Sequence, residues 1–165
     1  MSEELEYLID DEDTQKDRFL TFLIGEDSFG LEIGFVEEII RIQEITEIPS
    51  QPAYVRGVIN LRGKIIPAMD VRERFHKESR EYDDRTCVIV LNIGETPIGI
   101  IVDRVLEVLN IPEEQIAQPP EYRGDRATHF VKGIGTADDR VVMLLETPML
   151  LPGDEFLSGD AGIGA

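Results

Sequence analysis

The sequence predicts an all-β protein made of two copies of one small β-barrel, and three observations support this. Short apolar runs of strand length alternate with glycine-containing turns, a pattern typical of barrels and sandwiches. The longest apolar strings, at 99–102 and 141–145, are themselves of strand size. The chain also repeats itself, with an offset of 69 and, further on, of 76 positions. Matching pairs are Gly25 and Gly94, Gly30 and Gly99, Val36 and Val105, Arg56 and Lys132, and Asp70 and Glu146.

The first copy is expected to follow an acidic leader and to end near residue 80. We predict its strands at 19–24, 29–33, 36–45, 57–61 and 65–69. The segment 36–45 has an apolar spacing that also fits a helix, but its β-branched residues favour a short turn followed by a strand. Pro67 suggests an edge or bulge position for the last strand, since proline has no N–H to donate to a neighbour. A helical turn at 71–75 closes the copy.

The charged segment 80–85 marks the boundary between the copies, which gives subdomains at 18–80 and 81–152. The second copy repeats the same order of elements. Its strands are predicted at 86–93, 97–102, 105–109, 130–135 and 141–145, with a short helix at 147–151. A module of about 65 residues is marginal alone, so the copies should share an apolar interface with a third buried cluster between them. The sequence leaves open whether the two barrels exchange strands.

The charge of the chain limits what it binds. The formal net charge is −18, which argues against nucleic acid and anionic membranes as partners. We predict that residues 1–17 are a disordered acidic tail and that the glycine-rich residues 153–165 are a flexible tail. No apolar run approaches the ~20 residues of a membrane-spanning helix, so direct membrane insertion is not expected. The single Cys87 fits a reducing cytosol.

The sequence lacks the usual signatures of an enzyme. Its two histidines, His76 and His129, have no metal-ligand spacing, and Cys87 has no second cysteine with which to hold a metal. No glycine-rich phosphate loop is present either. We therefore expect no catalytic residue, no metal site and no cofactor. Cys87 is expected to be a buried strand cysteine, because a nucleophilic one would need a nearby base.

One stretch stands out from this background, the run from Arg56 to Phe75. It contains Asn60-Leu61-Arg62-Gly63, followed by Pro67 and by Asp70-Val71-Arg72. Together with the Gly25…Gly30 hairpin, the segment that begins at Val36 and the Gly99-Ile-Ile-Val-Asp103 stretch, it resembles the signature of the bacterial chemotaxis coupling (adaptor) protein family, CheW. The resemblance covers residues 18–152 approximately.

The resemblance implies a fold and a function. The fold is two five-stranded SH3-like β-barrels with short helical turns and a groove between them. The function is that of a non-catalytic scaffold, which couples the cytoplasmic tips of methyl-accepting chemoreceptors to the regulatory domain of the chemotaxis histidine kinase, in cytoplasmic arrays at the membrane. Two other interpretations stay open: a coupling protein of a different chemosensory pathway, such as one for surface motility, and a small-ligand sensor that uses the cleft between the barrels.

The resemblance also implies three contact surfaces. A receptor helix needs an apolar slot with a polar rim, and glycines at the slot would let it approach closely. The matching receptor-binding positions are Val36, Ile39, Gly57, Arg62, Gly99, Val105 and Val108. The matching kinase-binding positions are Glu38, Arg56 and Ile65. The positions for a second contact, which closes rings of coupler and kinase domains, are Pro119, Pro120 and Tyr122.

Arg62 has two compatible roles in this interpretation. It belongs to the partner surface, or a carboxylate holds it in place so that it shapes the groove. Glu38 is the candidate carboxylate, because a buried arginine needs such a partner. At the ring contact, Ala117 stands where some members of the family carry a charged residue, which leaves the strength of that contact open.

Overall fold

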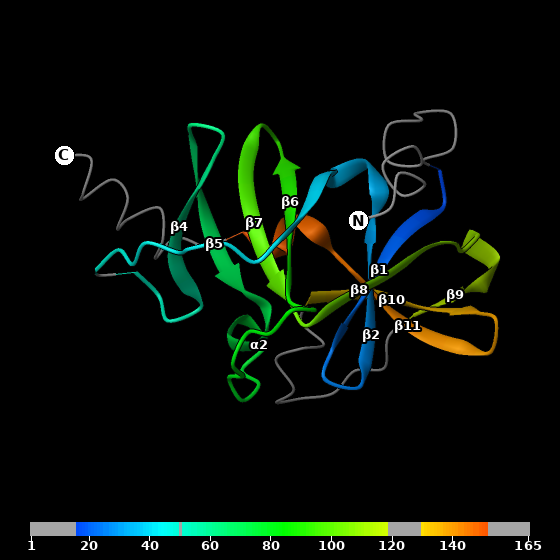
Figure 1. Cartoon of the computed structure of the whole chain (residues 1–165). Coiled ribbons are helices and arrows are strands. Elements are labelled where there is room, and N and C mark those ends of the chain that lie inside the picture. Colours follow the sequence, from blue (N-terminus) through cyan, green and yellow to red (C-terminus); the bar gives the residue numbers. More distant parts are fainter. Residues whose placement is uncertain (1–15, 50, 119–129, 152–165) are drawn as a thin grey trace.

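The computed structural model describes residues 16–49, 51–118 and 130–151 of the 165-residue chain, and most of these lie in β-strands (Figure 1). The strands are β1 Arg18–Ile24, β2 Asp27–Glu32, β3 Val36–Arg41, β4 Val55–Leu61, β5 Lys64–Asp70, β6 Cys87–Ile93, β7 Thr96–Val102, β8 Arg104–Asn110, β9 Ile116–Ala117, β10 Val131–Ala137 and β11 Arg140–Leu145. Short helical turns lie between them: η2 Ile33–Phe35, α2 Val71–Arg74, η3 Glu113–Gln115 and η5 Thr147–Leu150. The predicted all-β class with short helical turns is confirmed.

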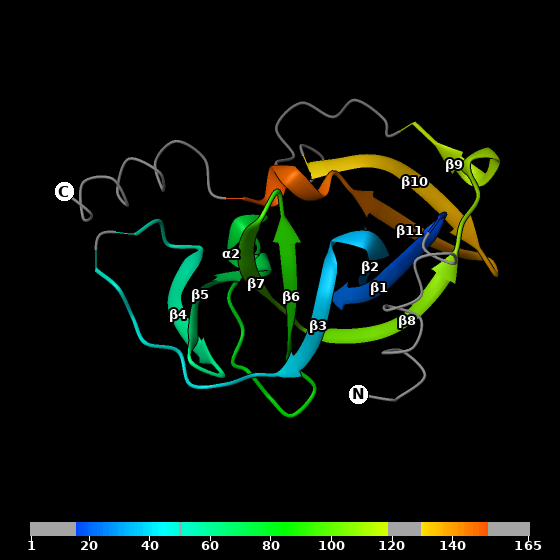
Figure 2. The same cartoon turned by 90° about the horizontal axis from the view of Figure 1, so that it is seen from above.

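The strands form two sheets that lie side by side (Figure 2). Sheet A has the order β8-β1-β2-β11-β10-β9, and sheet B has the order β3-β6-β7-β5-β4. In each sheet, the segment that follows the outer strand returns to the opposite edge and closes a barrel. Thr46 bridges to Val58 of β4 in sheet B, and β9 pairs with β10 in sheet A. The prediction of two small barrels is therefore confirmed, with the short strand β9 added to the five strands of sheet A.

The barrels exchange strands between the two copies of the repeat. By the repeat offsets, β1 and β2 correspond to β6 and β7, β3 corresponds to β8, and β4 and β5 correspond to β10 and β11. Sheet A combines β1 and β2 with β8, β10 and β11, whereas sheet B combines β6 and β7 with β3, β4 and β5. Neither 18–80 nor 81–152 builds a barrel alone. The boundary at residue 80 marks the sequence repeat rather than a border between the sheets.

Repeated glycines mark the places where strands from different copies meet. β2 runs parallel to β11 at Gly30, and β7 runs parallel to β5 at Gly99. A Cβ on Gly30 would lie 2.9 Å from Leu144 Cδ2, and one on Gly99 would lie 2.8 Å from Val88 Cγ1. Both distances are shorter than close-packed carbon atoms allow. The Gly30 contact is with β11 of the other copy, whereas the Gly99 contact is with β6 of its own copy.

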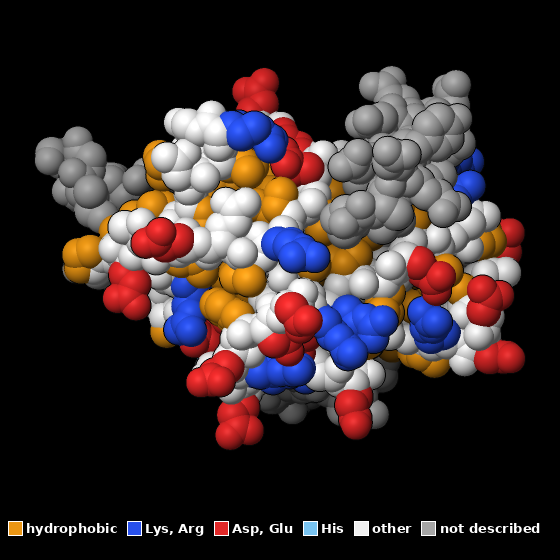
Figure 3. All heavy atoms as spheres, in the orientation of Figure 1, with side chains coloured by type: hydrophobic (Ala, Val, Ile, Leu, Met, Phe, Trp, Pro, Cys, Tyr) orange, Lys and Arg blue, Asp and Glu red, His pale blue; other side chains and the backbone are white. Residues whose placement is uncertain are grey.

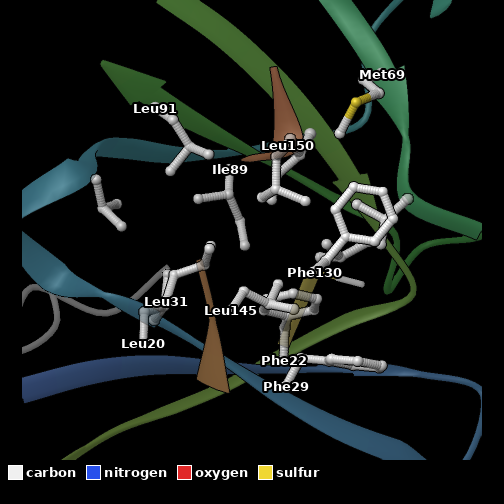
Figure 4. Close-up of a cluster of buried hydrophobic side chains, with 14 of the residues drawn as sticks. Leu20, Phe22, Phe29, Leu31, Met69, Ile89, Leu91, Phe130, Leu145 and Leu150 are labelled. Carbon is white, nitrogen blue, oxygen red and sulfur yellow. The ribbon is translucent and has the colours of Figure 1, made fainter. Parts of the chain in front are cut away.

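Buried apolar side chains gather in three clusters. The largest, the seam cluster, lies between the sheets and draws side chains from both (Figure 4). Its members include Leu20, Phe22, Phe29 and Leu31 from sheet A and Ile89, Leu91, Ile98 and Ile100 from sheet B. Each barrel has a smaller cluster of its own, around Ile59 and Ile66 in sheet B and around Val142 and Leu144 in sheet A. The predicted third cluster between the copies is confirmed, and it is the main core of the protein.

A chain of four phenylalanine rings runs through the seam cluster. The ring centroids of Phe22 and Phe29 are 5.8 Å apart, those of Phe29 and Phe75 are 5.2 Å apart, and those of Phe75 and Phe130 are 5.1 Å apart. Phe75 follows α2, which continues from β5 of sheet B, while Phe22 and Phe29 belong to sheet A. Aromatic contacts of this kind contribute about 0.5–1.5 kcal/mol each beyond area burial, so they help to join the barrels.

Of the two positions predicted for Pro67, an edge or a bulge, the edge is wrong, whereas a bulge does lie nearby, between Val55 and Gly57 in the pairing of β4 with β5. β5 lies between β7 and β4, and β4 is the outer strand. Pairing with β7 begins only at Ala68, one residue after Pro67. The missing N–H of Pro67 is tolerated inside the sheet because the second neighbour has not yet been reached. The other predicted local features are present: β3 follows the short turn η2, and α2 and η5 supply the predicted helical turns.

Candidate functional site

Two outer strands, β3 of sheet B and β8 of sheet A, lie on the same face of the molecule. Both are turned to the viewer in Figure 1, as the view in Figure 2 also shows. They carry four of the predicted receptor-binding residues, Val36 and Ile39 on β3 and Val105 and Val108 on β8. On this face, hydrophobic side chains reach the surface among charged side chains of both signs (Figure 3). The structure thus brings these four residues to the two sides of one seam between the sheets. We call the surface that they form the seam face.

A β-bulge in each outer strand orients these residues. The register shifts between Val36 and Glu38 in β3, and between Val105 and Val108 in β8. Residues three apart on a regular strand point to opposite faces, but one extra residue restores the same face. All four side chains accordingly lie in the seam cluster or pack against it. Val36 and Ile39 are buried, whereas Val105 and Val108 are half-buried and present apolar surface.

Arg62 forms an ion pair and hydrogen bond with Glu38, the partner predicted for it. The premise of that prediction is wrong, because the Arg62 side chain is 70% exposed rather than buried. Arg62 lies in the turn between β4 and β5 with φ +53°, beside Gly63 with φ +86°. The Gly63 N–H donates to Asn60 Oδ1 at 2.8 Å and fixes this turn. The ion pair therefore stands at the surface, where a partner protein can reach it.

At Gly57 and Gly99, neighbouring atoms of the protein leave no room for a side chain. A Cβ on Gly57 would lie 2.1 Å from the Thr46 carbonyl oxygen, and Gly57 has φ +150°. Its counterpart in the second copy, Gly133, meets the β9 side chain of Ile116 in the same way, at 2.6 Å. Gly99 faces Val88 inside the barrel of sheet B. Both glycines are thus packed against neighbouring atoms of sheet B, and their assignment to receptor binding stays a prediction.

The three predicted kinase-binding residues belong to sheet B. Ile65 on β5 is 57% exposed and pairs with Asn60 of β4, close to the turn that carries Arg62. Glu38 joins this group through its ion pair with Arg62. Arg56 lies four residues along β4 from Asn60, about 13 Å by strand geometry. The structure brings Glu38 and Ile65 to the same end of the β4–β5 hairpin and leaves Arg56 at the other end.

Arg56 belongs to a polar network that holds the segment between the two copies. Its guanidinium donates to Glu73 Oε1 at 3.1 Å and to the Tyr82 hydroxyl at 3.2 Å. The Tyr82 hydroxyl in turn donates to Asp70 Oδ2 at 2.7 Å, and Asp70 is buried. Burial and the hydrogen bond to Asp70 raise the pKa of Tyr82, so its hydroxyl stays a donor. Tyr82 had no role in the sequence analysis, which read its segment only as a charged boundary.

The second copy carries a counterpart of the Ile65 surface that the sequence analysis missed. Val141 on β11 corresponds to Ile65 by the offset of 76, and it is 60% exposed. Glu107 on β8 corresponds to Glu38, and it pairs with Arg140 at 3.0 Å. The repeat offsets were sufficient to find Val141. Pro119, Pro120 and Tyr122, the predicted ring-contact residues, lie outside the described residues.

Arg72 and Asp103, which the sequence analysis placed in motifs without a role, form the most deeply buried of the ion pairs between described residues. Arg72 Nη2 lies 2.6 Å from Asp103 Oδ2, and the two side chains are 16% and 12% exposed. The two residues lie 31 positions apart in separate motifs. Because each motif contains only one of the two residues, neither motif by itself predicts the ion pair.

Two findings concern metal and thiol chemistry among residues 16–49, 51–118 and 130–151. No group of three or more His, Cys, Asp or Glu side chains there is placed to hold a metal ion. Burial raises the pKa of the Cys87 thiol, the opposite of the shift that activates a nucleophilic cysteine. A cavity of ≈ 880 Å³ lies between Leu109, Ile116 and Ala137 at the β9 end of sheet A, not at the seam. None of the helices described is long and apolar enough to span a membrane.

Comparisons with known proteins agree with this architecture. Residues 18–155 match the CheW-like domain. The chain is 38% identical over 144 residues to the chemotaxis protein CheW of Klebsiella aerogenes, with 87% of each chain covered. It is 30% identical over 143 residues to the chemotaxis protein CheW of Treponema pallidum, with 84% of each chain covered. The crystal structure of the scaffolding protein TtCheW from Thermoanaerobacter tengcongensis superimposes with a TM-score of 0.77 at 35% identity, covering 84% of this chain and 94% of that one.

The match extends through both copies of the repeat, from β1 to η5, and so includes the outer strands, the Arg62 turn and the buried seam. Sequence identity and fold point to the same family, and the relatives named above are chemotaxis proteins. With twin barrels, a shared apolar seam and a matching domain model, this chain belongs to the CheW family of chemotaxis proteins.

Proposed function

We propose that this chain is a non-catalytic scaffold that couples the cytoplasmic signalling tips of chemoreceptors to the regulatory domain of the chemotaxis histidine kinase. It would act in the cytoplasm, at membrane-associated receptor arrays. The main support is the pair of bulged outer strands, which turn two apolar residues each toward one seam. A surface of this kind suits a protein helix, which buries an apolar face in a slot with a polar rim.

The receptor contact is proposed at the seam face. Val105 and Val108 supply apolar surface there, while Val36 and Ile39 support it from the buried side. A two-helix receptor tip carries apolar side chains at intervals of three and four residues, so one face of it can cover both strands. Each contact is expected to be modest, near or below ~800 Å² per partner, because many copies in an array add avidity.

The kinase contact is proposed at the end of the β4–β5 hairpin, with Ile65 as its apolar centre. An exposed isoleucine beside an ion pair is a common arrangement at protein interfaces, in which an apolar centre is ringed by polar groups. Glu38 and Arg62 supply that ring here. Arg56, at the other end of the hairpin, would mark the margin of the contact rather than its centre.

A second, ring-closing contact is proposed on the barrel of sheet A. Val141 presents the same exposed apolar position as Ile65, in the equivalent hairpin. An ion pair is available here too, because Glu107, the counterpart of Glu38, pairs with Arg140, which stands at the position of Lys64. The residues expected for this contact from the family, Pro119, Pro120 and Tyr122, stay as predictions.

The test is a pair of titrations by calorimetry, one with a two-helix receptor-tip peptide and one with the C-terminal regulatory domain of the kinase. Val108→Thr should weaken receptor binding about threefold to tenfold and leave kinase binding unchanged. Ile65→Asp should weaken kinase binding to the same extent and leave receptor binding unchanged. Glu114→Gln, at an exposed position on η3, is the matched control and should bind both partners normally. Wild-type protein that binds neither partner, or variants that affect both equally, would overturn the proposal.

A further inference from the structure

We infer that Asp103 is a positioning residue that fixes the start of β8, and with it Val105, against both sheets. The inference rests on the proposed function, because the seam face gives this position its purpose. Asp103 is the single residue between β7 of sheet B and β8 of sheet A. The chain therefore crosses from one barrel to the other at this residue, two positions before Val105.

The Asp103 carboxylate ties three segments together. It accepts hydrogen bonds from Arg72 Nε at 2.8 Å and Nη2 at 2.6 Å, and from the Gly25 N–H at 2.7 Å. Gly25 lies in the β1–β2 turn of sheet A, while Arg72 lies in α2, which follows β5 of sheet B. The Asp103 N–H also donates to the Leu23 carbonyl at 3.2 Å. Charge-assisted bonds of this kind, with little exposure to water, are stronger and more directional than surface ion pairs.

Arg72 extends the tie to the segment between the two copies. Its Nη1 donates to the Glu78 carbonyl at 3.0 Å, and Arg80 Nη1 approaches Asp103 Oδ2 at 3.4 Å. One largely buried carboxylate, 12% exposed, thus connects both sheets and the segment that joins the copies.

The two copies of the repeat can be compared at these positions, and the comparison distinguishes a positioning role of Asp103 from a general role in folding. At the corresponding position of the first copy the chain has Gly34, which has no carboxylate. At the position that corresponds to Arg72 it has Pro148, which has no donor. The strand order of sheet B nevertheless corresponds, strand for strand, to that of sheet A: β3-β6-β7-β5-β4 matches β8-β1-β2-β11-β10. β3, the counterpart of β8, therefore takes its place at the edge of sheet B without a tie of this kind, so the tie is particular to the start of β8.

Beyond its bulge, β8 has supports other than its pairing with β1. Thr21 Oγ1 donates to the Glu107 carbonyl at 2.6 Å and accepts from the Glu107 N–H at 3.1 Å, and Glu107 pairs with Arg140 of β11. Among the described strands, β8 pairs with β1 at the edge of sheet A, and the bulge after Val105 separates the start of β8 from these supports. A strand held on one side can shift by a fraction of its width, and such a shift would move Val105 relative to Val36 across the seam. Asp103 removes this freedom at the end of β8 nearest Val105.

The experiment compares Asp103→Asn with Lys77→Gln. Asparagine keeps the size of the side chain and removes the charge that Arg72 requires. Lys77→Gln removes a more exposed ion pair, with Asp27 at 3.3 Å, which joins the β1–β2 hairpin to the segment after α2. We expect Asp103→Asn to weaken receptor-tip binding about tenfold, with binding of the kinase regulatory domain unchanged. Lys77→Gln should leave receptor-tip binding and kinase-domain binding unchanged. Asp103→Glu keeps the charge, so its affinity for the receptor tip should be closer to wild type than that of Asp103→Asn.

Amide hydrogen exchange supplies a second readout on the full chain. Asp103→Asn should speed exchange in β8 and leave β3 unchanged. Equal loss of both binding activities, or unchanged exchange in β8, would overturn the inference. If the wild-type protein does not bind the receptor tip, the proposed function fails, and the exchange rates in β8 then decide alone whether Asp103 positions that strand.

Discussion

Arg62 and Glu38 join two elements at opposite ends of the order of sheet B. Glu38 lies on β3, the first strand of the sheet, and Arg62 lies in the turn between β5 and the last strand, β4. Their ion pair therefore spans the line along which the sheet closes into a barrel, beside the backbone bridge from Thr46 to Val58. In sheet A, Glu107 corresponds to Glu38, but its partner Arg140 is the first residue of β11 and stands at the position of Lys64 rather than of Arg62.

This placement predicts that Arg62→Gln changes binding more than stability. The arginine side chain is 70% exposed, and exposed ion pairs contribute little to the free energy of unfolding. Kinase-domain binding should fall several-fold, because the ion pair flanks Ile65. Urea unfolding and calorimetric titration measure the two effects. Arg140→Gln is the control, with a similarly small change in stability and normal kinase binding; a large loss of stability in Arg62→Gln would contradict the prediction.

Gly57→Ala should destabilise the protein by about 3 kcal/mol or more, because the new Cβ would meet the Thr46 carbonyl and the backbone has a positive φ. The bridge from Thr46 to Val58 would open. Gly63→Ala is the matched control. It also has a positive φ, but nothing lies within 4 Å of its Cβ position, so it should cost only about 1 kcal/mol. Urea midpoints test this, and equal costs at the two glycines would refute the steric explanation.

The order of local elements could be predicted because glycine turns and β-branched runs are local signals. The ambiguity of 36–45 has a structural cause. The bulge in β3 puts Val36 and Ile39 on one face although they are three residues apart, and that spacing imitates a helix. The same bulge explains the spacing of Val105 and Val108.

The exchange of strands could not be predicted from the sequence. The hairpin β1–β2 and its counterpart β6–β7 present similar apolar faces, so each fits either barrel by local pattern alone. Ion pairs were predictable only in part. Glu38 was correctly chosen for Arg62, although Arg62 proved to be exposed, whereas Asp103 and Arg72 meet only through the crossing from β7 to β8.

Ile65→Asp and Val141→Asp should separate two contacts of one scaffold. Both side chains are exposed, so each change should alter the free energy of unfolding by no more than about 0.5 kcal/mol. Ile65→Asp should weaken binding of the isolated kinase regulatory domain about threefold to tenfold. Val141→Asp should preserve that binding but reduce the size of assemblies formed with receptor fragments and kinase, as measured by sedimentation. Full-size assemblies with Val141→Asp would remove Val141 from the ring contact.

Asp103 also predicts a pH dependence of stability whose sign follows from its pKa. Burial raises the pKa of the Asp103 carboxyl, but the hydrogen bonds from Arg72 and the Gly25 N–H outweigh it and leave the pKa below its usual range. A carboxyl whose pKa is lower in the folded state stabilises the fold above its unfolded pKa, about 3.9 for aspartate, and this contribution is lost as the pH falls through the folded pKa. The stability gap between wild type and Asp103→Asn should therefore be constant from about pH 5 to 8 and shrink below about pH 4. Urea midpoints of both proteins across this range measure the gap, and Lys77→Gln serves as the control. A gap that persists undiminished at about pH 2, well below the unfolded pKa, would show that Asp103 acts through packing rather than through its charge.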